Sequence, residues 1–312
     1  MKIKLLLVFC LSFLVVGCGD ERPARLQSNI QRADYLLNNL GKNLQANALR
    51  NAIILREYAT LLGDDKPQLK PLLAQLSRDA TPSGPMFQAL QQRLKTVKEE
   101  PLVLGDIEAQ LRETENLIEA SDPNLFNDAL SDPINVIADM SDGQLARVNA
   151  ISKQRSLQAN SAEDTGAGSQ LVGNPSYGNW QTGSNGGSFW QWYGMYAMFS
   201  ALSPRPIYYD RWSSRRDYSY YNDYGRNRYT SPQQAKSQDN LAQRTKKQFA
   251  NRGGFKSPYA KSKTGASRMS NSSHRAQKAT PFAGKSSFSK AKSSSSFRNS
   301  GATTSRGIRR GK

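Results

Sequence analysis

Side chains that could act as nucleophiles or general bases at neutral pH are scarce in this chain. Its 312 residues include two cysteines, Cys10 and Cys18, and one histidine, His274. A Ser-His-Asp arrangement or a histidine-rich metal site needs its histidine held rigidly by a fold. His274 lies in the polar run SNSSHRAQK, which has no apolar pattern to hold it. We therefore expect neither an enzyme nor a cofactor, although chemistry that uses carboxylates alone is left open.

The first 17 residues have the layout of a secretory signal peptide. Lys2 and Lys4 precede an apolar run of about 12 residues, Leu5–Val16, and a membrane-spanning helix needs about 20. The run ends in VVGC, Val15–Cys18, which resembles the lipobox of bacterial lipoprotein precursors. The resemblance implies a diacylglyceryl group on the sulfur of Cys18, cleavage before this residue and acylation of the new amino group. Two or three acyl chains anchor a protein durably in a membrane.

This interpretation also bears on the thiol chemistry and the location. Cys10 would leave with the signal peptide and Cys18 would carry lipid, so no thiol would remain for a disulfide or a thiolate metal site. Gly19 carries no retention signal by the enteric rule, so we expect a lipid-anchored protein at the outer membrane, on its periplasmic or surface face. Asp20 acts as a retention signal in some other proteobacteria, which leaves the inner membrane open. The alternative is an ordinary signal peptide with a chance cysteine.

Charge divides the chain into an acidic part and a basic part. Residues 19–165 contain 21 acidic and 16 basic side chains, whereas residues 166–312 contain 4 and 25. Twelve of the acidic side chains lie in the block Glu99–Asp142, and none follows Asp239, after which 18 lysines and arginines occur. Such blocks indicate tails and interaction surfaces more than one compact fold.

Apolar residues at helical spacing predict an all-α domain over residues 18–151. The first stripe ends at Gly41 and the second at Gly63, where we expect the first two helices to stop. A short third helix, a fourth that begins at Pro85 and a fifth with Ile107 in its stripe follow. Because each helix has a single apolar face, we expect them to pack as an antiparallel helical bundle.

A small internal repeat closes this domain. SDPNLFNDAL, SDPINVIADM and SDGQLARVNA follow one another from Ser121, Ser131 and Ser141. Aspartate caps helix N-termini and proline suits the first turn, so the repeat predicts three short helices in succession. The alternative is a divalent-cation site, although the spacing does not fit an EF-hand loop. Its ligands would be Asp128, Asp132, Asp139 and Asp142.

Residues 152–187 and 188–230 are predicted to be a linker and an aromatic segment. Polar residues and glycine dominate the linker, and such a composition cannot offset the entropy of ordering. The aromatic segment opens with SFWQWYGMYAMF. Its apolar stretch of about 14 residues is too short to span a bilayer. It therefore predicts either a core helix packed on the bundle or a contact surface for the membrane or a protein partner.

The contact interpretation rests on residue type. Tryptophan and tyrosine favour the headgroup region of a membrane, because each combines an apolar body with a polar edge. On a helix, one face would carry four of the aromatic side chains. The residues expected to contact the membrane or a partner are Phe189, Trp190, Trp192, Tyr193, Tyr196 and Phe199.

Residues 231–312 are rich in Ser, Lys, Arg, Gly and Gln, which is typical of a disordered tail. Each Lys or Arg near an anionic surface contributes about 1 kcal/mol of binding within a Debye length, so we expect the tail to bind a polyanion, either an anionic envelope polymer or lipid headgroups. The alternatives are a merely solvated tail and a tail folded back on the block Glu99–Asp142. The residues expected to bind the polyanion are Arg252, Lys256, Lys261, Lys263, Arg268, Arg306, Arg309 and Arg310.

Three short motifs carry a further resemblance. GSFW at Gly187–Trp190, RGGF at Arg252–Phe255 and TTSRG in the tail are similar to the C-terminal half of an uncharacterised family of small proteobacterial lipoprotein-like proteins, which implies an envelope location. RGGF also resembles nucleic-acid-binding RGG segments. An exported protein does not meet cytoplasmic nucleic acid, so nucleic acid is not the expected partner. We expect non-catalytic binding or scaffolding at an anionic envelope surface or polymer. The alternative is an assembly or accessory subunit that recognises a specific envelope protein through the helical bundle and the aromatic segment.

Overall fold

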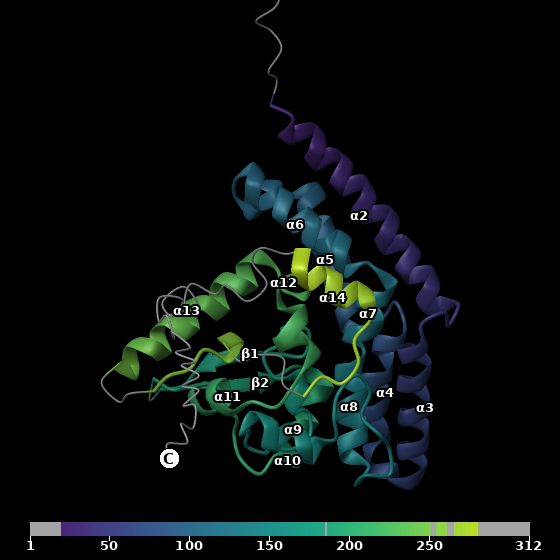
Figure 1. The fold of residues 1–312 in the computed structure, drawn as a ribbon, viewed down its shortest axis with the longest axis vertical. Helices are drawn as coiled ribbons and strands as arrows, with labels where there is room; N and C mark the ends of the chain where they lie inside the picture. The colour runs from purple at the N-terminus through teal and green to yellow at the C-terminus, as the bar shows by residue number, and fades with distance from the viewer. Residues whose placement is uncertain (1–19, 185, 251–253, 261–264, 280–312) are drawn as a thin grey trace, which may run out of the picture.

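The computed structural model is mostly helical, with one small two-stranded sheet (Figure 1). The predicted signal peptide, Cys18 and residues 280–312 lie outside the described part of the chain, so the signal peptide, the lipidation and the disorder at the C-terminal end stay predictions. The described residues are 20–184, 186–250, 254–260 and 265–279.

Five helices build the N-terminal part. α2 packs along α6 and α5, while α3 packs on α4 (Figure 1). α5 begins at Pro85 as predicted, because proline in the first turn leaves no helical hydrogen bond unmade. The helices are α2 (Arg22–Gln45), α3 (Arg50–Asp65), α4 (Lys70–Ser77), α5 (Pro85–Glu99) and α6 (Ile107–Ala120), with the short 3-10 helices η2 (Pro67–Leu69), η3 (Arg78–Ala80) and η4 (Pro101–Leu104) between them.

The two glycines at the ends of the apolar stripes do not end their helices. α2 continues past Gly41 to Gln45, and α3 continues past Gly63 to Asp65. A Cβ atom at Gly41 would lie 3.0 Å from Cζ of Phe87. The glycine therefore lets the Phe87 ring of α5 pack against the backbone of α2. The prediction of a helix end was wrong because close packing, not helix termination, requires glycine here.

The Ser-Asp-Pro repeat forms two helices instead of three. These are α7 (Pro123–Ala129) and α8 (Ser131–Met140). Asp122 caps α7, because its carboxylate accepts hydrogen bonds from two backbone N–H groups of the first turn. In the third copy Gly143 replaces proline, and Asp142 has φ +53°. This left-handed backbone turns the chain, so the predicted third helix was wrong.

The predicted linker is part of the folded core. Leu171, Val172 and Tyr177 have no exposed surface. Gly173 has φ +89°, and a Cβ atom there would lie 2.9 Å from Cη2 of Trp212. Glycine here permits a left-handed turn against an indole ring, so the prediction of a flexible linker was wrong. The elements of residues 152–187 are α9 (Lys153–Asn160), η5 (Ser169–Leu171) and β1 (Gly178–Thr182).

The aromatic segment and the start of the tail also fold. α13 (Pro232–Gln248) begins with a capping box between Ser231 and Gln234 and buries Leu241 and Ala242. Disorder was therefore the wrong prediction for this stretch. The other elements are β2 (Ser188–Trp192), η6 (Gly194–Met198), α10 (Phe199–Leu202), α11 (Tyr209–Arg215), the π-helix η7 (Tyr221–Gly225), α12 (Arg226–Tyr229), η9 (Pro258–Ala260) and α14 (Asn271–Ala279).

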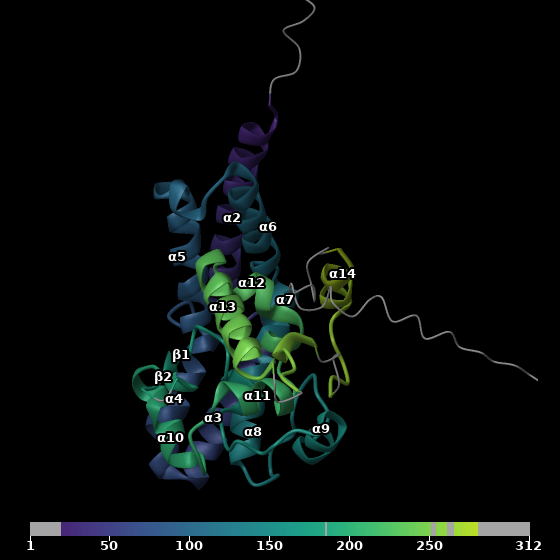
Figure 2. The ribbon, with the colours of Figure 1, turned by 90° about the vertical axis from the view of Figure 1, so that its left-hand side faces the viewer.

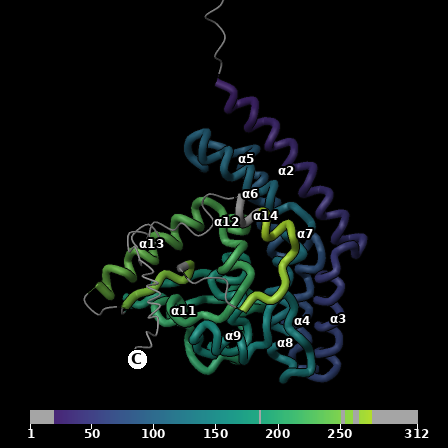
Figure 3. Tube along the Cα trace, viewed as in Figure 1, coloured from purple at the N-terminus to yellow at the C-terminus, as the bar shows by residue number. Residues whose placement is uncertain are grey.

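One contiguous cluster of buried apolar side chains joins the two parts of the chain, from Ala33 in α2 to Ala242 in α13. The boundary predicted at residue 151 therefore does not separate two cores. α14 returns to lie beside α7 (Figure 3). There Ser270 N and Ser273 Oγ donate hydrogen bonds to Asp128, so this stretch of the tail does fold back on the acidic block, through serines and a backbone amide.

Candidate functional site

The six predicted aromatic contact residues do not share one helix: Phe189, Trp190 and Trp192 lie on strand β2 of a hairpin, and the others follow it. β2 pairs antiparallel with β1, and Trp190 lies opposite Trp180. Side chains alternate along a strand, so Trp190 and Trp192 both point inward and are buried. Tyr196 and Phe199 on the following helices are also buried, which agrees with the core interpretation. Only two of the six predicted residues retain substantial exposure: Phe189 is half-buried and Tyr193 is 44% exposed.

Trp180 is the centre of this aromatic core. Its ring centroid lies 5.1 Å from that of Trp190, 4.9 Å from that of Tyr209 and 5.0 Å from that of Trp212. Each such pair contributes about 0.5–1.5 kcal/mol beyond the burial of its area. The aromatic residues therefore fix the hairpin to α11, and most of them have no surface left for a membrane or a partner.

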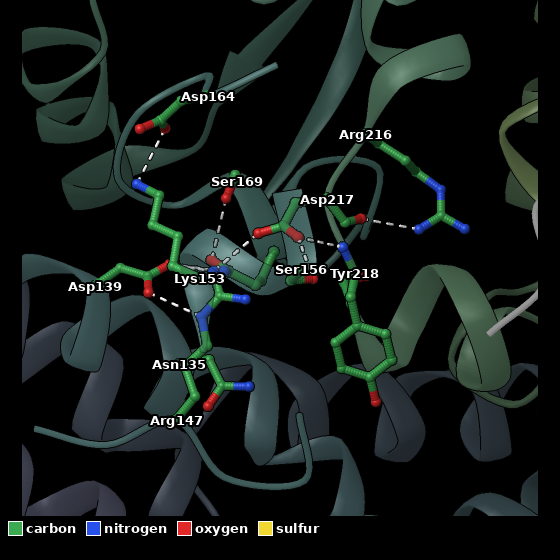
Figure 4. Close-up of polar contacts among 12 residues, drawn as sticks. Asn135, Asp139, Arg147, Lys153, Ser156, Asp164, Ser169, Arg216, Asp217 and Tyr218 are labelled. Carbon is green, nitrogen blue, oxygen red and sulfur yellow. Dashed lines mark hydrogen bonds and ion pairs between the residues drawn. The ribbon is translucent and has the colours of Figure 1, made fainter. Parts of the chain in front are cut away.

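A buried ionic network fastens the loop before α9 to the C-terminal part (Figure 4). Arg147 Nη2 lies 2.7 Å from Asp139 and 2.8 Å from Asp217, and all three side chains are buried. Ser156 and Gln170 donate further hydrogen bonds to the two carboxylates. Burial acts to lower the pKa of Arg147, but the hydrogen bond to Asp139 and the two negative charges raise it above its usual value. The network is a structural clamp, because one guanidinium group holds both buried carboxylates and the Ser156 and Gln170 side chains satisfy further oxygens of these carboxylates.

A second buried pair joins α5, α6 and α12. Arg93 donates from Nε and Nη2 to the two carboxylate oxygens of Glu113, at 2.7 and 2.9 Å. Its Nη1 donates to the backbone oxygen of Arg228, whose own Nε donates to Glu119 at 2.8 Å. Two carboxylates of the acidic block are thus held by arginines within the fold.

The aspartates of the repeat have separate partners. Asp128 accepts from Ser270 and Ser273, Asp132 from two backbone N–H groups, Asp139 from Arg147 and Gln170, and Asp142 from Lys66. Within the described ranges, no three histidine, cysteine or acidic side chains are grouped so that they could hold a metal ion. The structure therefore gives no support to the divalent-cation alternative.

Two fully buried carboxyl groups have no ion-pair partner among the described residues. Burial raises the pKa of Asp79 to about 7, although Tyr177 Oη and Met86 N donate hydrogen bonds to it at 2.7 and 3.2 Å. Burial likewise raises the pKa of Asp132 to about 8, against hydrogen bonds from Tyr221 N and Tyr220 N. Both groups therefore titrate close to neutral pH inside the core.

The outward face of α13 is a charged surface. α13 lies on the outside of the molecule (Figure 2). Lys236, Arg244 and Lys247 are exposed and make no ion pair with the residues that the structure describes. Spacings of 8 and 11 residues put them on one side of a helix. We call this surface the α13 basic face; its groove is lined by Gln233, Lys236, Ser237, Asn240, Gln243, Arg244 and Lys247.

The composition of the tail predicts disorder and therefore gives no indication of the α13 basic face. Ser231 and Gln234 form the capping-box pattern, which is visible in the sequence and could have revealed the helix. Of the predicted polyanion-binding residues, Lys256 and Arg268 are exposed. The other six lie outside the described residues: Arg252, Lys261, Lys263, Arg306, Arg309 and Arg310.

Comparison with known proteins gives no relative. No protein-family model, no curated protein and no solved structure matches the chain. Across the described ranges, no helix has both the length and the apolar character needed to cross a membrane.

Proposed function

We propose that this chain is a lipid-anchored envelope protein that binds an anionic polymer through the α13 basic face, without catalysis. The observation that carries the proposal is the arrangement of Lys236, Arg244 and Lys247 on one side of a docked helix. Exposed cations without an acidic partner are free to neutralise an external polyanion, and a helix docked on the core presents them in a fixed line. The basic residues of the tail would extend the same surface.

The features of the anchor end favour a polymer, and not the lipid bilayer, as the anionic partner. α2 begins four positions after Cys18, and Arg22 at its start lies 3.4 Å from Glu108 of α6. Acidic side chains prevail around this end, which would face the membrane. α13 slopes away from it (Figure 1). α13 therefore extends away from the anchor end, and in this proposal its basic face meets a polymer and not the bilayer. The acidic side chains near the anchor end include Asp20, Glu21, Glu99, Glu100, Asp106 and Glu108.

The same end also carries an apolar tip that suits a membrane-facing position. Leu102 and Val103 of η4 are 87% and 50% exposed, and η4 directly precedes the start of α6 that Arg22 contacts. Side chains of this kind can enter the boundary of a bilayer once a lipid holds the chain there.

In this proposal the N-terminal helices form a bundle at the membrane. Cys18→Ser should move the chain from the membrane fraction to the soluble fraction.

Binding of the full chain in detergent to polyphosphate and to alginate tests the proposal. We expect salt-dependent binding to both polymers. The triple variant Lys236→Ala/Arg244→Ala/Lys247→Ala should weaken it and reduce the slope of log K against log salt by about three, roughly one for each lost contact.

A matched control has the same loss of charge on the N-terminal helices. Arg32, Lys42 and Arg50 are exposed, and their triple alanine variant should bind like the parent chain. Equal weakening by the two triple variants would show that net charge alone acts, and the absence of binding by the parent chain would end the proposal.

A further inference from the structure

A cleft of about 890 Å³ opens where the C-terminal end of α13 meets the segment that leads into α11. Its size falls in the range of ligand-binding clefts, which combine an apolar wall with a few polar groups. Three stretches of the chain form it: residues 163–165, 186–188 and 204–212. The side chains of α13 and the residue after it that complete the lining are Thr245, Gln248 and Phe249.

One wall of the cleft is an aromatic platform on a rigid support. Tyr208 is 40% exposed, whereas Tyr209 and Trp212 beside it are buried. The backbone of Tyr208 forms a bridge with Phe189 of β2, and Tyr209 stands against the Trp180 ring at 4.9 Å. A planar ligand face on Tyr208 would therefore meet a residue whose backbone is already held in place, which lowers the entropic cost of binding.

Polar groups on the same walls are left without partners. The Oη atom of Tyr209 and Nε1 of Trp212 are buried and make no hydrogen bond with the described residues. Buried groups of this kind are normally satisfied, so an unpaired one needs an explanation. A ligand in the cleft would offer an acceptor to the Trp212 N–H group, because Trp212 belongs to the lining.

The charges in the cleft favour an anionic group. Two carboxylates of the lining are already paired, Glu163 with Arg215 and Asp164 with Lys153. Arg205 and Arg211 line the cleft, are exposed and have no ion-pair partner within the described ranges, and Asp210 is the one remaining acidic side chain. Two free guanidinium groups against one carboxylate suit a ligand that carries carboxylate or phosphate.

We propose that the cleft binds a sugar unit of an anionic polysaccharide, with the C–H face of the ring on Tyr208 and its acidic group on Arg205 or Arg211. A sugar ring has an apolar face that can pack on the aromatic wall and hydroxyl groups that can bond to the polar groups of the cleft. An inorganic polyanion has neither. Gln248 of the cleft follows Lys247 of the α13 basic face in the sequence, so both surfaces include the C-terminal end of α13. The inference rests on the proposed function and narrows its polymer to a glycan.

Three probes distinguish recognition of the sugar from attraction to negative charge: alginate oligomers, polyphosphate of matched charge and neutral dextran. Each is titrated into the full chain by calorimetry. We expect alginate to bind more tightly than polyphosphate and to retain measurable binding at high salt. Tyr208→Ala should weaken alginate binding at least about fivefold, as loss of a central aromatic contact does, and should leave polyphosphate unchanged. Arg205→Ala/Arg211→Ala should remove the preference for alginate.

Tyr35→Ala is the control, because Tyr35 of α2 is an exposed tyrosine, 66%, that lines neither the cleft nor the groove of the α13 basic face. It should bind all three probes like the parent chain, and thermal unfolding checks that each variant is folded. Equal binding of alginate and polyphosphate, with no effect of Tyr208→Ala, would overturn the glycan site and leave the polyanion proposal standing. Failure of the parent chain to bind either polymer would overturn both.

Discussion

The hydroxyl group of Tyr177 donates a 2.7 Å hydrogen bond to Oδ2 of Asp79, and both side chains are completely buried. The two residues are 98 positions apart, so this bond ties the segment before β1 to η3 of the N-terminal helices. Burial raises the pKa of Asp79 to about 7. The carboxyl group is therefore mainly protonated in the folded chain at mildly acidic pH and loses its proton near neutrality.

This titration predicts a fold that weakens as pH rises. The usual pKa of aspartate is 3.8, and the folded value is about 7, so the folded state holds a proton that the unfolded state has released. The contribution to stability is complete below about pH 4 and is lost as pH rises through about 7. Asp79→Asn cannot ionise and should reduce the fall in melting temperature between pH 5 and pH 8, measured by circular dichroism.

Asp132 should account for part of the pH dependence, and an exposed aspartate serves as the control. The pKa of Asp132 is also raised, to about 8, so some pH dependence should survive in Asp79→Asn. Asp64 is exposed, and Asp64→Asn should follow the parent chain at every pH. A pH dependence in Asp79→Asn equal to that of the parent would contradict the role given to Asp79.

The Ser-Asp-Pro repeat predicts different costs for two aspartates in the same motif. Asp122 accepts from Asn124 N and Leu125 N at the exposed start of α7, and Asp122→Ala should cost about 1 kcal/mol, as for a lost N-cap. Asp132 instead accepts from Tyr220 N and Tyr221 N in the core. Asp132→Ala leaves two buried donors unsatisfied and should cost about 2 kcal/mol or more. Urea unfolding measures both, and equal costs would argue against this division.

The repeat also illustrates which part of the fold can be predicted. Local signals act within a few residues, so the starts of α5 and α7 follow from their prolines. The partner of Asp132 lies 88 positions away, and no local pattern indicates it. The helix of the α13 basic face could be predicted only in part. Its capping box is a local signal, but its buried stripe includes the polar residues Gln238 and Thr245 and therefore gives a weak hydropathy signal.

The hairpin shows how one pattern can fit two structures. Phe189, Trp192, Tyr196 and Phe199 have helical spacing, and this predicted one aromatic face. Alternation of Trp190, Gln191 and Trp192 fits a strand equally well, and the two runs NWQT and SFWQW flank a stretch rich in Gly, Ser and Asn. Pairing with β1 decides between them, because the Trp180 ring packs on that of Trp190 only across two strands. The cleft between α13 and the segment before α11 includes residues next to this hairpin and could not be predicted without it.

Two glycines with the same backbone conformation allow the cost of backbone strain to be measured apart from the cost of a packing clash. Gly173 and Gly143 both have φ +89°, which disfavours any residue with a Cβ atom. A Cβ atom at Gly173 would lie 2.9 Å from the Trp212 ring, whereas none of the described atoms lies within 4 Å at Gly143. Gly143→Ala should cost about 1 kcal/mol from the backbone alone, and Gly173→Ala should cost clearly more. Equal changes in unfolding free energy would mean that the Trp212 ring moves aside freely.

The buried Arg93–Glu113 pair predicts a large loss of stability when one of its two charges is deleted. Both side chains are buried, with 7% and 1% exposure, so Glu113→Ala leaves a guanidinium group in the core and should cost about 3–5 kcal/mol. Lys95 and Glu99 form an exposed pair on α5, and Glu99→Ala should change the unfolding free energy by about 0.5 kcal/mol or less. Chemical denaturation compares the two directly.

A double replacement distinguishes two causes of the loss in Glu113→Ala: the lost attraction of the ion pair and the cost of a buried, unpaired guanidinium group. In Arg93→Met/Glu113→Leu neither charge remains in the core, and apolar side chains of similar size fill the space. Much of the stability lost in Glu113→Ala should return, because the cost of that variant lies mainly in the uncompensated guanidinium group. The hydrogen bond from Arg93 to the Arg228 carbonyl is also lost, so recovery should stop short of the parent. If the double variant is no more stable than Glu113→Ala, the pair stabilises the junction of α5, α6 and α12 by direct attraction.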